Sequence, residues 1–171
     1  MCLWGGEMSY AIIIRGPLGV GKSTISEILA KKLKAKHFEM DKIFDEYNLA
    51  KNRKEGFDVT PKSSRKVNEL LVPKIKQVMK SKNPVIIEGN FYLKSQLNDL
   101  IKKLNSKNYI FTLKAPVEVC IDRDSKRKNT CGKDAARVVH NKTSEFDEGI
   151  IIDTKNKTPA QTINEILRFI E

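Results

Sequence analysis

One eight-residue segment, residues 16–23 with the sequence GPLGVGKS, constrains the fold more than any other feature of the chain. It matches the pattern G-x-x-x-x-G-K-[ST] at every fixed position. The preceding residues 10–15 (YAIIIR) are apolar and β-branched, which predicts a buried strand. Apolar residues then recur at the spacing of one helix face. A strand, a glycine-rich loop and a helix N-terminus form an anion site, because backbone N–H groups and the helix dipole face the anion.

The side chains of this segment suit a nucleoside triphosphate bound with magnesium. Lys22 can reach the β- and γ-phosphates, and the Ser23 hydroxyl can hold Mg2+. The competing interpretation, a chance match in an ordinary glycine turn, is disfavoured by the flanking strand and helix. The expected nucleotide-binding residues of the loop and helix start are Gly16, Pro17, Leu18, Gly19, Val20, Gly21, Lys22, Ser23 and Thr24.

Length and composition favour one folded domain. The chain has 171 residues and 40% hydrophobic residues, enough for a core. We expect residues 1–7 to form a loose tail, with Met8 as an alternative start, and residues 8–171 to form a single domain. No apolar run approaches the roughly 20 residues of a membrane helix, and the first residues lack the basic start of a secretory signal. The three cysteines form no C-x-x-C pair, so a cytoplasmic location is expected.

The formal net charge is +11, from 32 basic and 21 acidic residues. Such a charge favours a polyanionic partner, such as nucleic acid, or a phosphorylated substrate. A lysine-rich, solvated surface explains it equally well, because much of the charge is scattered. The sequence carries no signal for an oligomeric state.

Strands and helices are predicted to alternate along the whole chain. Strands are expected at residues 10–15, 35–40, 84–88, 109–113 and 149–153. Helices are expected at residues 25–33, 41–48, 63–80, 97–104, 115–128 and 134–140, and from Pro159 onward. Pro73 predicts a kink or a break in the helix over 63–80. The alternation predicts an α/β fold, a parallel sheet with helices on both faces, whose ligands bind beyond the carboxyl ends of the strands.

Carboxylates follow two of the predicted strands. Asp41, after the second strand, can accept a proton from an attacking hydroxyl or position it, although it also suits a helix N-cap. Glu88, at the end of the third strand, can hold a magnesium-bound water or bind the acceptor. Its alternative is a solvent-facing acid. Gly89 and Asn90 would let the backbone approach a substrate closely.

Arginines in the helix after the fourth strand are candidates for charge stabilisation. Arg123 and Arg127 are four residues apart and share a helix face, where they suit the oxygens of a transferred phosphoryl group. A solvated face is the alternative, because the segment around them is almost entirely charged. The break at residues 129–132 suggests a hinged lid. Arg137 could close from the other side.

The other basic candidates carry weaker signals. Arg65, in a lysine-rich stretch, is placed in the acceptor site, although a solvated helix face explains it equally well. His37 and His140 have no partner at ligand spacing, so each is expected to be a surface or partly packed histidine.

Together these residues resemble the small P-loop kinases of the adenylate-kinase-like fold, over residues 8–171. Within that group the chain is most similar to polynucleotide-kinase-like and zeta-toxin-like members and to adenylate kinase-related ATP-binding proteins. The resemblance implies a three-layer fold with the sheet order 2-3-1-4-5, a short lid, ATP and Mg2+. It makes Asp41 the acceptor-side carboxylate, Arg123 and Arg127 lid arginines, and places Lys155 and Asn156 near adenine.

The chain departs from the motifs of these kinases at two places, and both concern the part that binds the acceptor. Residues 88–92 (EGNFY) lack the arginine that follows the third strand in adenylate kinases, and the Gly-Gly-Gly stretch of shikimate kinases is missing. The leading hypothesis is a kinase that phosphorylates a hydroxyl of a small molecule. A kinase acting on an RNA, DNA or tRNA hydroxyl is the first alternative, and an ATP-binding switch, ATPase or nucleic-acid-binding module is the second.

Overall fold

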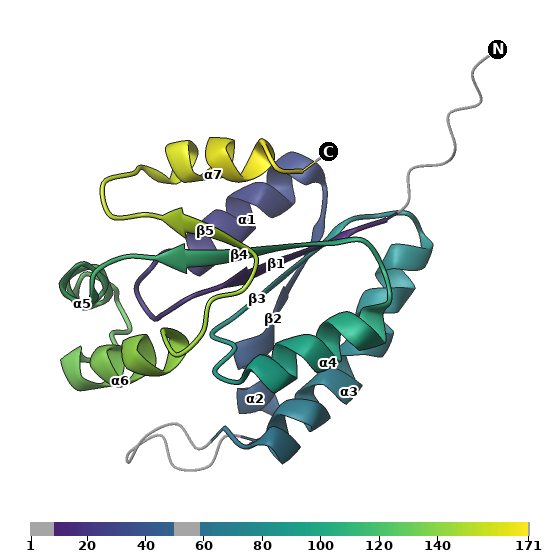
Figure 1. Cartoon of the computed structure of the whole chain (residues 1–171), viewed down its shortest axis with the longest axis horizontal. Helices are drawn as coiled ribbons and strands as arrows, with labels where there is room; N and C mark the ends of the chain where they lie inside the picture. Colours follow the sequence, from purple (N-terminus) through teal and green to yellow (C-terminus); the bar gives the residue numbers. More distant parts are fainter. Residues whose placement is uncertain (1–8, 50–58, 171) are drawn as a thin grey trace.

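A five-stranded parallel sheet organises the computed structural model, which describes residues 9–49 and 59–170 (Figure 1). The strand order is β2-β3-β1-β4-β5, which confirms the predicted α/β fold and topology. The predicted tail and Met8 lie outside the described residues. The strands are β1 (Ala11–Arg15), β2 (Lys36–Glu39), β3 (Val85–Gly89), β4 (Asn108–Lys114) and β5 (Ile150–Asp153).

Helices cover both faces of this sheet. The described helices are α1 (Lys22–Leu33), α2 (Met40–Glu46), α3 (Pro61–Lys80), α4 (Lys94–Leu104), α5 (Val117–Ser125), α6 (Lys133–Thr143) and α7 (Pro159–Leu167). In Figure 1, α1 and α7 lie on one face, and α3 and α4 lie on the other. None of the helices in the described ranges is both long and apolar enough to cross a membrane.

The alternation of side chains along β1 divides the core in two. Ile12 and Ile14 pack with apolar residues of α1 and α7. Ala11 and Ile13 pack with α2, α3 and α4 on the opposite face. All four side chains are fully buried. A central strand covered on both faces explains why this segment is continuously apolar.

Helix α3 differs from its prediction at two points. It begins at Pro61 rather than residue 63, because Thr60 and Ser63 form a capping box before it. The helix then runs through Pro73 without a break. Pro73 is exposed on the helix surface.

The segment expected to form the lid consists of α5, residues 126–132 and α6. Helix α5 ends at Ser125, earlier than predicted, and α6 extends further, to Thr143. Figure 1 shows the two helices together beyond the carboxyl ends of β4 and β5. The lid segment therefore lies at the edge of the sheet where the predicted ligand site should be.

Candidate active site

The phosphate-binding loop connects β1 to α1 at the carboxyl edge of the sheet. Its backbone needs glycine at two positions that decide its shape. Gly19 has a φ of 80°, and a Cβ there would overlap the carbonyl oxygen of Cys120. Gly21 caps α1 with a φ of 104°, so the helix begins at Lys22 with its N-terminus directed into the loop. This arrangement confirms the strand, loop and helix expected from the motif.

The ammonium group of Lys22 is buried against the loop it belongs to. It donates hydrogen bonds to the carbonyl oxygen of Pro17 at 3.0 Å and to Oδ1 of Asn90 at 2.9 Å. Burial lowers the pKa of Lys22, and Arg127 lowers it further, while Asp41 and Glu88 act in the opposite direction. Lys22 is therefore held at the site by groups from two strand ends, and both Asp41 and Arg127 are close enough to influence its charge.

Ser23, Glu88 and His37 form a hydrogen-bonded chain across three elements. Ser23 Oγ donates to Oε1 of Glu88 at 2.8 Å, and His37 Nε2 donates to Oε2 at 3.0 Å. Burial disfavours the ionised form of Glu88, but the bonds from His37 and Ser23 and the charge of Lys22 outweigh it and lower its pKa. The hydroxyl and the carboxylate present oxygen atoms of the kind that Mg2+ prefers. The donor set thus fits magnesium.

His37 was not recognised as part of the site from the sequence. It is partly packed, as predicted, but it has a partner in Glu88 on the neighbouring strand. The parallel register between β2 and β3 places His37 beside Ile86, two residues before Glu88. Side chains two residues apart on a strand share one face of the sheet, so the imidazole can reach the carboxylate. The register depends on how the two strands pair, which the sequence alone does not give.

Asp41 lies at the start of α2, directly beyond β2. Burial raises the pKa of Asp41, with Glu88 and Asp45 as like-charged neighbours, while Lys22 and the backbone N–H of Asn90 act against the increase. No side chain caps α2, whose N-cap is Glu39, so the N-cap alternative for Asp41 is wrong. A carboxylate whose pKa is raised is a stronger base, and so is better suited to accept a proton.

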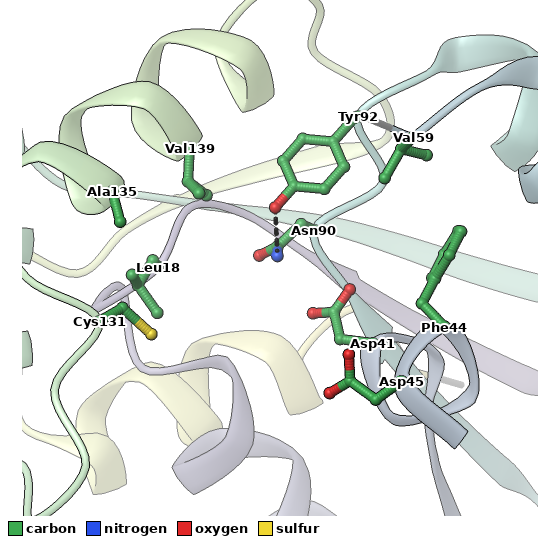
Figure 2. Close-up of a pocket in the computed structure, with 10 residues that line it drawn as sticks. All are labelled: Leu18, Asp41, Phe44, Asp45, Val59, Asn90, Tyr92, Cys131, Ala135 and Val139. Carbon is green, nitrogen blue, oxygen red and sulfur yellow. Dashed lines mark hydrogen bonds between the residues drawn. The ribbon is translucent and has the colours of Figure 1, made fainter. Parts of the chain in front are cut away.

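Asp41 opens onto a cavity of about 330 Å³ (Figure 2). Within this cavity, the amide nitrogen of Asn90 donates a hydrogen bond of 2.8 Å to the Tyr92 hydroxyl. The lining residues are Leu18, Asp41, Phe44, Asp45, Val59, Asn90, Tyr92, Cys131, Ala135 and Val139. We call this space the Asp41 cavity.

A second cavity, of about 390 Å³, lies on the other side of the loop. Its lining residues are Gly19, Val20, Gly21, Thr24, Ile25, Arg123, Arg127, Thr154, Lys157, Pro159 and Thr162. We call this space the Arg123 cavity. Its position beside the loop and the N-terminus of α1, together with its arginines, suits the binding of an anion such as a phosphate.

The two predicted lid arginines have different surroundings. Arg123 donates to Thr154 Oγ1 at 3.0 Å and to the Thr154 carbonyl at 2.7 Å, and more weakly to the carbonyl of Val20. It joins α5 to the loop after β5. Arg127 is exposed beyond the end of α5 and close enough to affect the pKa of Lys22. Both arginines line the Arg123 cavity, but Arg123 is held by hydrogen bonds, whereas Arg127 is exposed and acts on the charge of Lys22.

Other predicted site residues lie at the margin of this arrangement. Lys155 and Asn156 are exposed and are not among the residues that line the Arg123 cavity, whereas Thr154 and Lys157 of the same loop are. Arg65 lines a separate hollow between α2 and α3, with Lys62 and Lys66 among its neighbours. It is not among the residues that line the Asp41 cavity. The sequence places Arg65 on a charged helix face, but it does not show which hollow that face borders.

Two charged residues that sequence reasoning passed over organise the surroundings. Asp124, counted there with a solvated helix face, is buried and accepts hydrogen bonds at Oδ2 from Thr130, Cys131 and Gly132. Arg15, at the end of β1, is fully buried. A charged residue closing an apolar strand immediately before the loop was the available signal for Arg15.

The fold and this site define a nucleotide-binding P-loop protein of the kinase type. The family model AAA_18, described as an AAA domain, matches residues 12–150. The chain therefore belongs to the AAA_18 family. Its fold is the adenylate-kinase-like fold named from the motifs above.

Individual relatives point to the same class. A shikimate kinase from Clostridium botulinum (strain Eklund 17B / Type B) is 30% identical over 133 residues, which are 77% of each chain. A sugar kinase from Janibacter sp. HTCC2649 superposes with a TM-score of 0.80 at 21% identity, covering 95% of this chain and 94% of that one. A gluconokinase from Sinorhizobium meliloti 1021 gives 0.73 at 15% identity, covering 95% and 91%. These relatives are named as kinases of small molecules, so the comparisons favour a kinase in general.

Proposed function

We propose that this protein transfers the γ-phosphate of MgATP to a hydroxyl group of a small-molecule acceptor. The observation that carries the proposal is the position of the phosphate loop between two cavities. Leu18 lines the Asp41 cavity, and the next three residues of the same loop line the Arg123 cavity. A phosphate chain lying on this loop would have its nucleoside on one side and an acceptor on the other. This placement satisfies the proximity that a direct transfer requires.

Each polar group of the site has a role in such a transfer. Ser23 and Glu88 would hold Mg2+, which supplies positive charge to the phosphate oxygens when it is bound. Lys22 and Arg127 would bind the oxygens of the transferred group, on which negative charge is spread. Arg123, Lys157 and the predicted neighbours Lys155 and Asn156 would surround the nucleoside. These roles assign Glu88 to the metal rather than to the acceptor.

Asp41 would serve the acceptor. As the acceptor oxygen forms its bond to the γ-phosphorus, the bond to the β-phosphate oxygen breaks and ADP leaves. The hydroxyl proton moves to the Asp41 carboxylate. The side chain of Asn90 bonds both Lys22 and Tyr92. It would therefore hold the lysine that binds the phosphate at a fixed distance from the acceptor site in the Asp41 cavity.

The test is ADP release from MgATP with a panel of acceptors: sugars, shikimate-like acids, nucleosides, nucleoside monophosphates and 5′-hydroxyl RNA and DNA. Lys22→Ala is the blank, and Lys31→Ala, an exposed lysine near the end of the same helix, is the matched control. We expect one class of small alcohol to raise the rate in the parent and in Lys31→Ala but not in Lys22→Ala.

Two other results would replace the proposal. Stimulation by RNA or DNA alone would favour the polynucleotide alternative. Tight, Lys22-dependent binding of MgATP with no stimulation by any acceptor would favour a switch or an ATPase.

A further inference from the structure

We propose that Asp124 is a positioning residue for phosphoryl transfer, which holds the segment between α5 and α6 so that Arg127 reaches the transferred group. This inference rests on the proposed function, because that function assigns Arg127 to the oxygens of this group. Asp124 belongs to none of the sequence motifs of the site.

Arg127 depends on its surroundings for a defined position. It is exposed beyond the end of α5 and lines the Arg123 cavity. Within the described part of the chain, its side chain forms no hydrogen bond or ion pair. An arginine on an unsupported segment would lose conformational freedom whenever it binds a phosphoryl group, which weakens the contact. The place of Arg127 must therefore be set through its backbone.

Asp124 ties the backbone on both sides of Arg127 to one residue. The carbonyl oxygen of Asp124 accepts a hydrogen bond from the N–H of Arg127 at 3.0 Å. Its carboxylate oxygen Oδ2 accepts from the N–H of Cys131 at 3.0 Å and from that of Gly132 at 3.2 Å. These bonds close residues 124–132 into a ring that contains Arg127.

The carboxylate of Asp124 is buried, and the ring provides its partners. The Thr130 hydroxyl donates to the same Oδ2 at 2.8 Å, and Asp124 is 1% exposed. Asp122, on the same helix, is instead exposed and pairs with Lys126 at the surface. A buried carboxylate is costly unless hydrogen bonds compensate for its lost hydration. The bonds to residues 130–132 provide this compensation.

The same carboxylate joins the ring to the two helices. Gly132 is the N-cap of α6, with a φ of 91° and no side-chain cap. A carboxylate bonded to its N–H places negative charge at the start of α6, where it is favourable. Helix α5 is itself fixed, because Arg123 bonds Thr154. The position of Arg127 is thereby referred to the wall of the Arg123 cavity.

The experiment measures the contact of Arg127 without the need for an acceptor. Calorimetry gives the affinity for MgADP and for MgADP with aluminium fluoride, which takes the place of the transferred phosphoryl group. The variants are Asp124→Ala, Arg127→Ala and the double variant. Asp122→Ala is the matched control, because it removes an exposed acid from the same helix.

We expect aluminium fluoride to tighten the binding of MgADP to the parent, and Arg127→Ala to reduce this gain about tenfold or more. Asp124→Ala should lose the gain to a similar extent and change the affinity for MgADP alone by less than about twofold. The double variant should lose no more than either single variant, because the two residues act as a unit. Additive losses, or a full gain in Asp124→Ala, would overturn the proposal.

A second variant keeps the test decisive if Asp124→Ala does not fold. Thr130→Val removes one exposed hydroxyl that bonds both Asp124 and the N–H of Gly132. It should reduce the aluminium fluoride gain about threefold, and Asp124→Asn, which keeps an oxygen acceptor, should recover most of the gain. A full gain in Thr130→Val would contradict the role of the ring.

Hydrogen exchange shows whether the ring has opened. The amides of Cys131 and Gly132 should exchange about tenfold faster in Asp124→Ala than in Asp122→Ala. Amides of the buried strand β1 should stay protected in both, which identifies a folded protein. Unchanged protection at Cys131 and Gly132 in a folded Asp124→Ala would count against the proposal.

These outcomes are distinct from a failure of the proposed function. Nucleotide binding that does not depend on Lys22, or a parent that gains nothing from aluminium fluoride, would remove the transfer reaction and the inference with it. A gain that depends on Arg127 but not on Asp124 or Thr130 would remove only the positioning role.

Discussion

At the scale of single residues, the site depends on charged side chains held by neutral or oppositely charged partners from distant segments. Asn90 is the connecting residue, since its two amide atoms bond Lys22 and Tyr92. Glu88 likewise uses both carboxylate oxygens, one for Ser23 and one for His37. Groups fixed in this way need little reorganisation when charge develops during a reaction.

Asp41 predicts a pH dependence. Its burial raises the pKa, and the carboxylate must be ionised to accept a proton. The rate of transfer, kcat/KM for the acceptor, should therefore fall as the pH drops through a pKa above the ordinary aspartate range, with a slope of about one. Asp41→Asn should lower kcat by about a hundredfold or more and remove this limb, while binding of MgATP is retained. Full transfer by Asp41→Asn would exclude the role assigned to Asp41.

His37 is predicted to position Glu88 rather than to touch the nucleotide. His37→Phe removes the donor to Oε2, so the Mg2+ concentration needed for half-maximal activity should rise about tenfold, as for other residues that orient metal ligands. His37→Gln, which can still donate, should recover most of this affinity. The Mg2+ dependence of ADP release measures both. An unchanged Mg2+ requirement in His37→Phe would show that the bond is not needed to orient the carboxylate.

At the scale of elements, the loops beyond β1 and β5 are joined by one side chain of α5. Arg123 connects α5 to Thr154 and to the Val20 carbonyl of the phosphate loop. One turn of helix thus contacts both the loop after β5 and the loop after β1. The wall of the Arg123 cavity depends on this connection.

Arg123→Ala should therefore act mainly on the nucleotide. Without its hydrogen bonds the loop after β5 loses its link to α5, and the KM for ATP should rise about tenfold or more with a smaller change in kcat. Lys126→Ala, an exposed residue near the end of the same helix, is the control. A large loss of kcat with an unchanged KM would instead assign Arg123 to the transferred phosphoryl group.

Sequence patterns predicted the elements better than they predicted the charged side chains. The loop, the strand ends at Asp41 and Glu88, and the sheet order followed from local motifs and the family resemblance. Nearly all residues from Asp122 to Lys128 are charged, which is typical of a solvated helix face. No periodicity in this segment distinguishes a buried acid from an exposed one. Asp124 became identifiable only when the chain returned to place Thr130 and Cys131 against it.

At the scale of the whole molecule, Arg15 links the central strand to the lid. Its guanidinium donates to the carbonyls of Thr143 and Phe146, each at 2.8 Å, and to Thr112 Oγ1 at 3.2 Å. It also lies 4.0 Å from the centre of the Phe146 ring. Burial lowers its pKa to about 10, against the opposing charges of Asp147 and Glu148, so Arg15 remains charged at neutral pH.

Arg15→Met should destabilise the fold. The substitution keeps an apolar stem but leaves buried carbonyl oxygens without a donor, so the free energy of unfolding should fall by about 3 kcal/mol. Urea denaturation measures this change. Arg168→Met, at an exposed position after α7, should change stability by less than about 0.5 kcal/mol. Equal stability of the two variants would show that the buried guanidinium contributes nothing net.

The bonds of Arg15 also determine how the lid can move. They fasten the last turn of α6, at Thr143, to the strand that carries the phosphate loop, whereas the first turn follows Gly132 in the segment that Asp124 holds. We predict that α6 turns about this fixed last turn, with its first turn moving together with α5, which holds it through Asp124. This movement would widen the Asp41 cavity near Cys131 and leave its width near Val139 unchanged. An acceptor would then enter past Cys131, and the space near Val139 would limit how thick a bound acceptor can be. Hydrogen exchange should accordingly slow at residues 130–135 on acceptor binding and stay constant at residues 139–143.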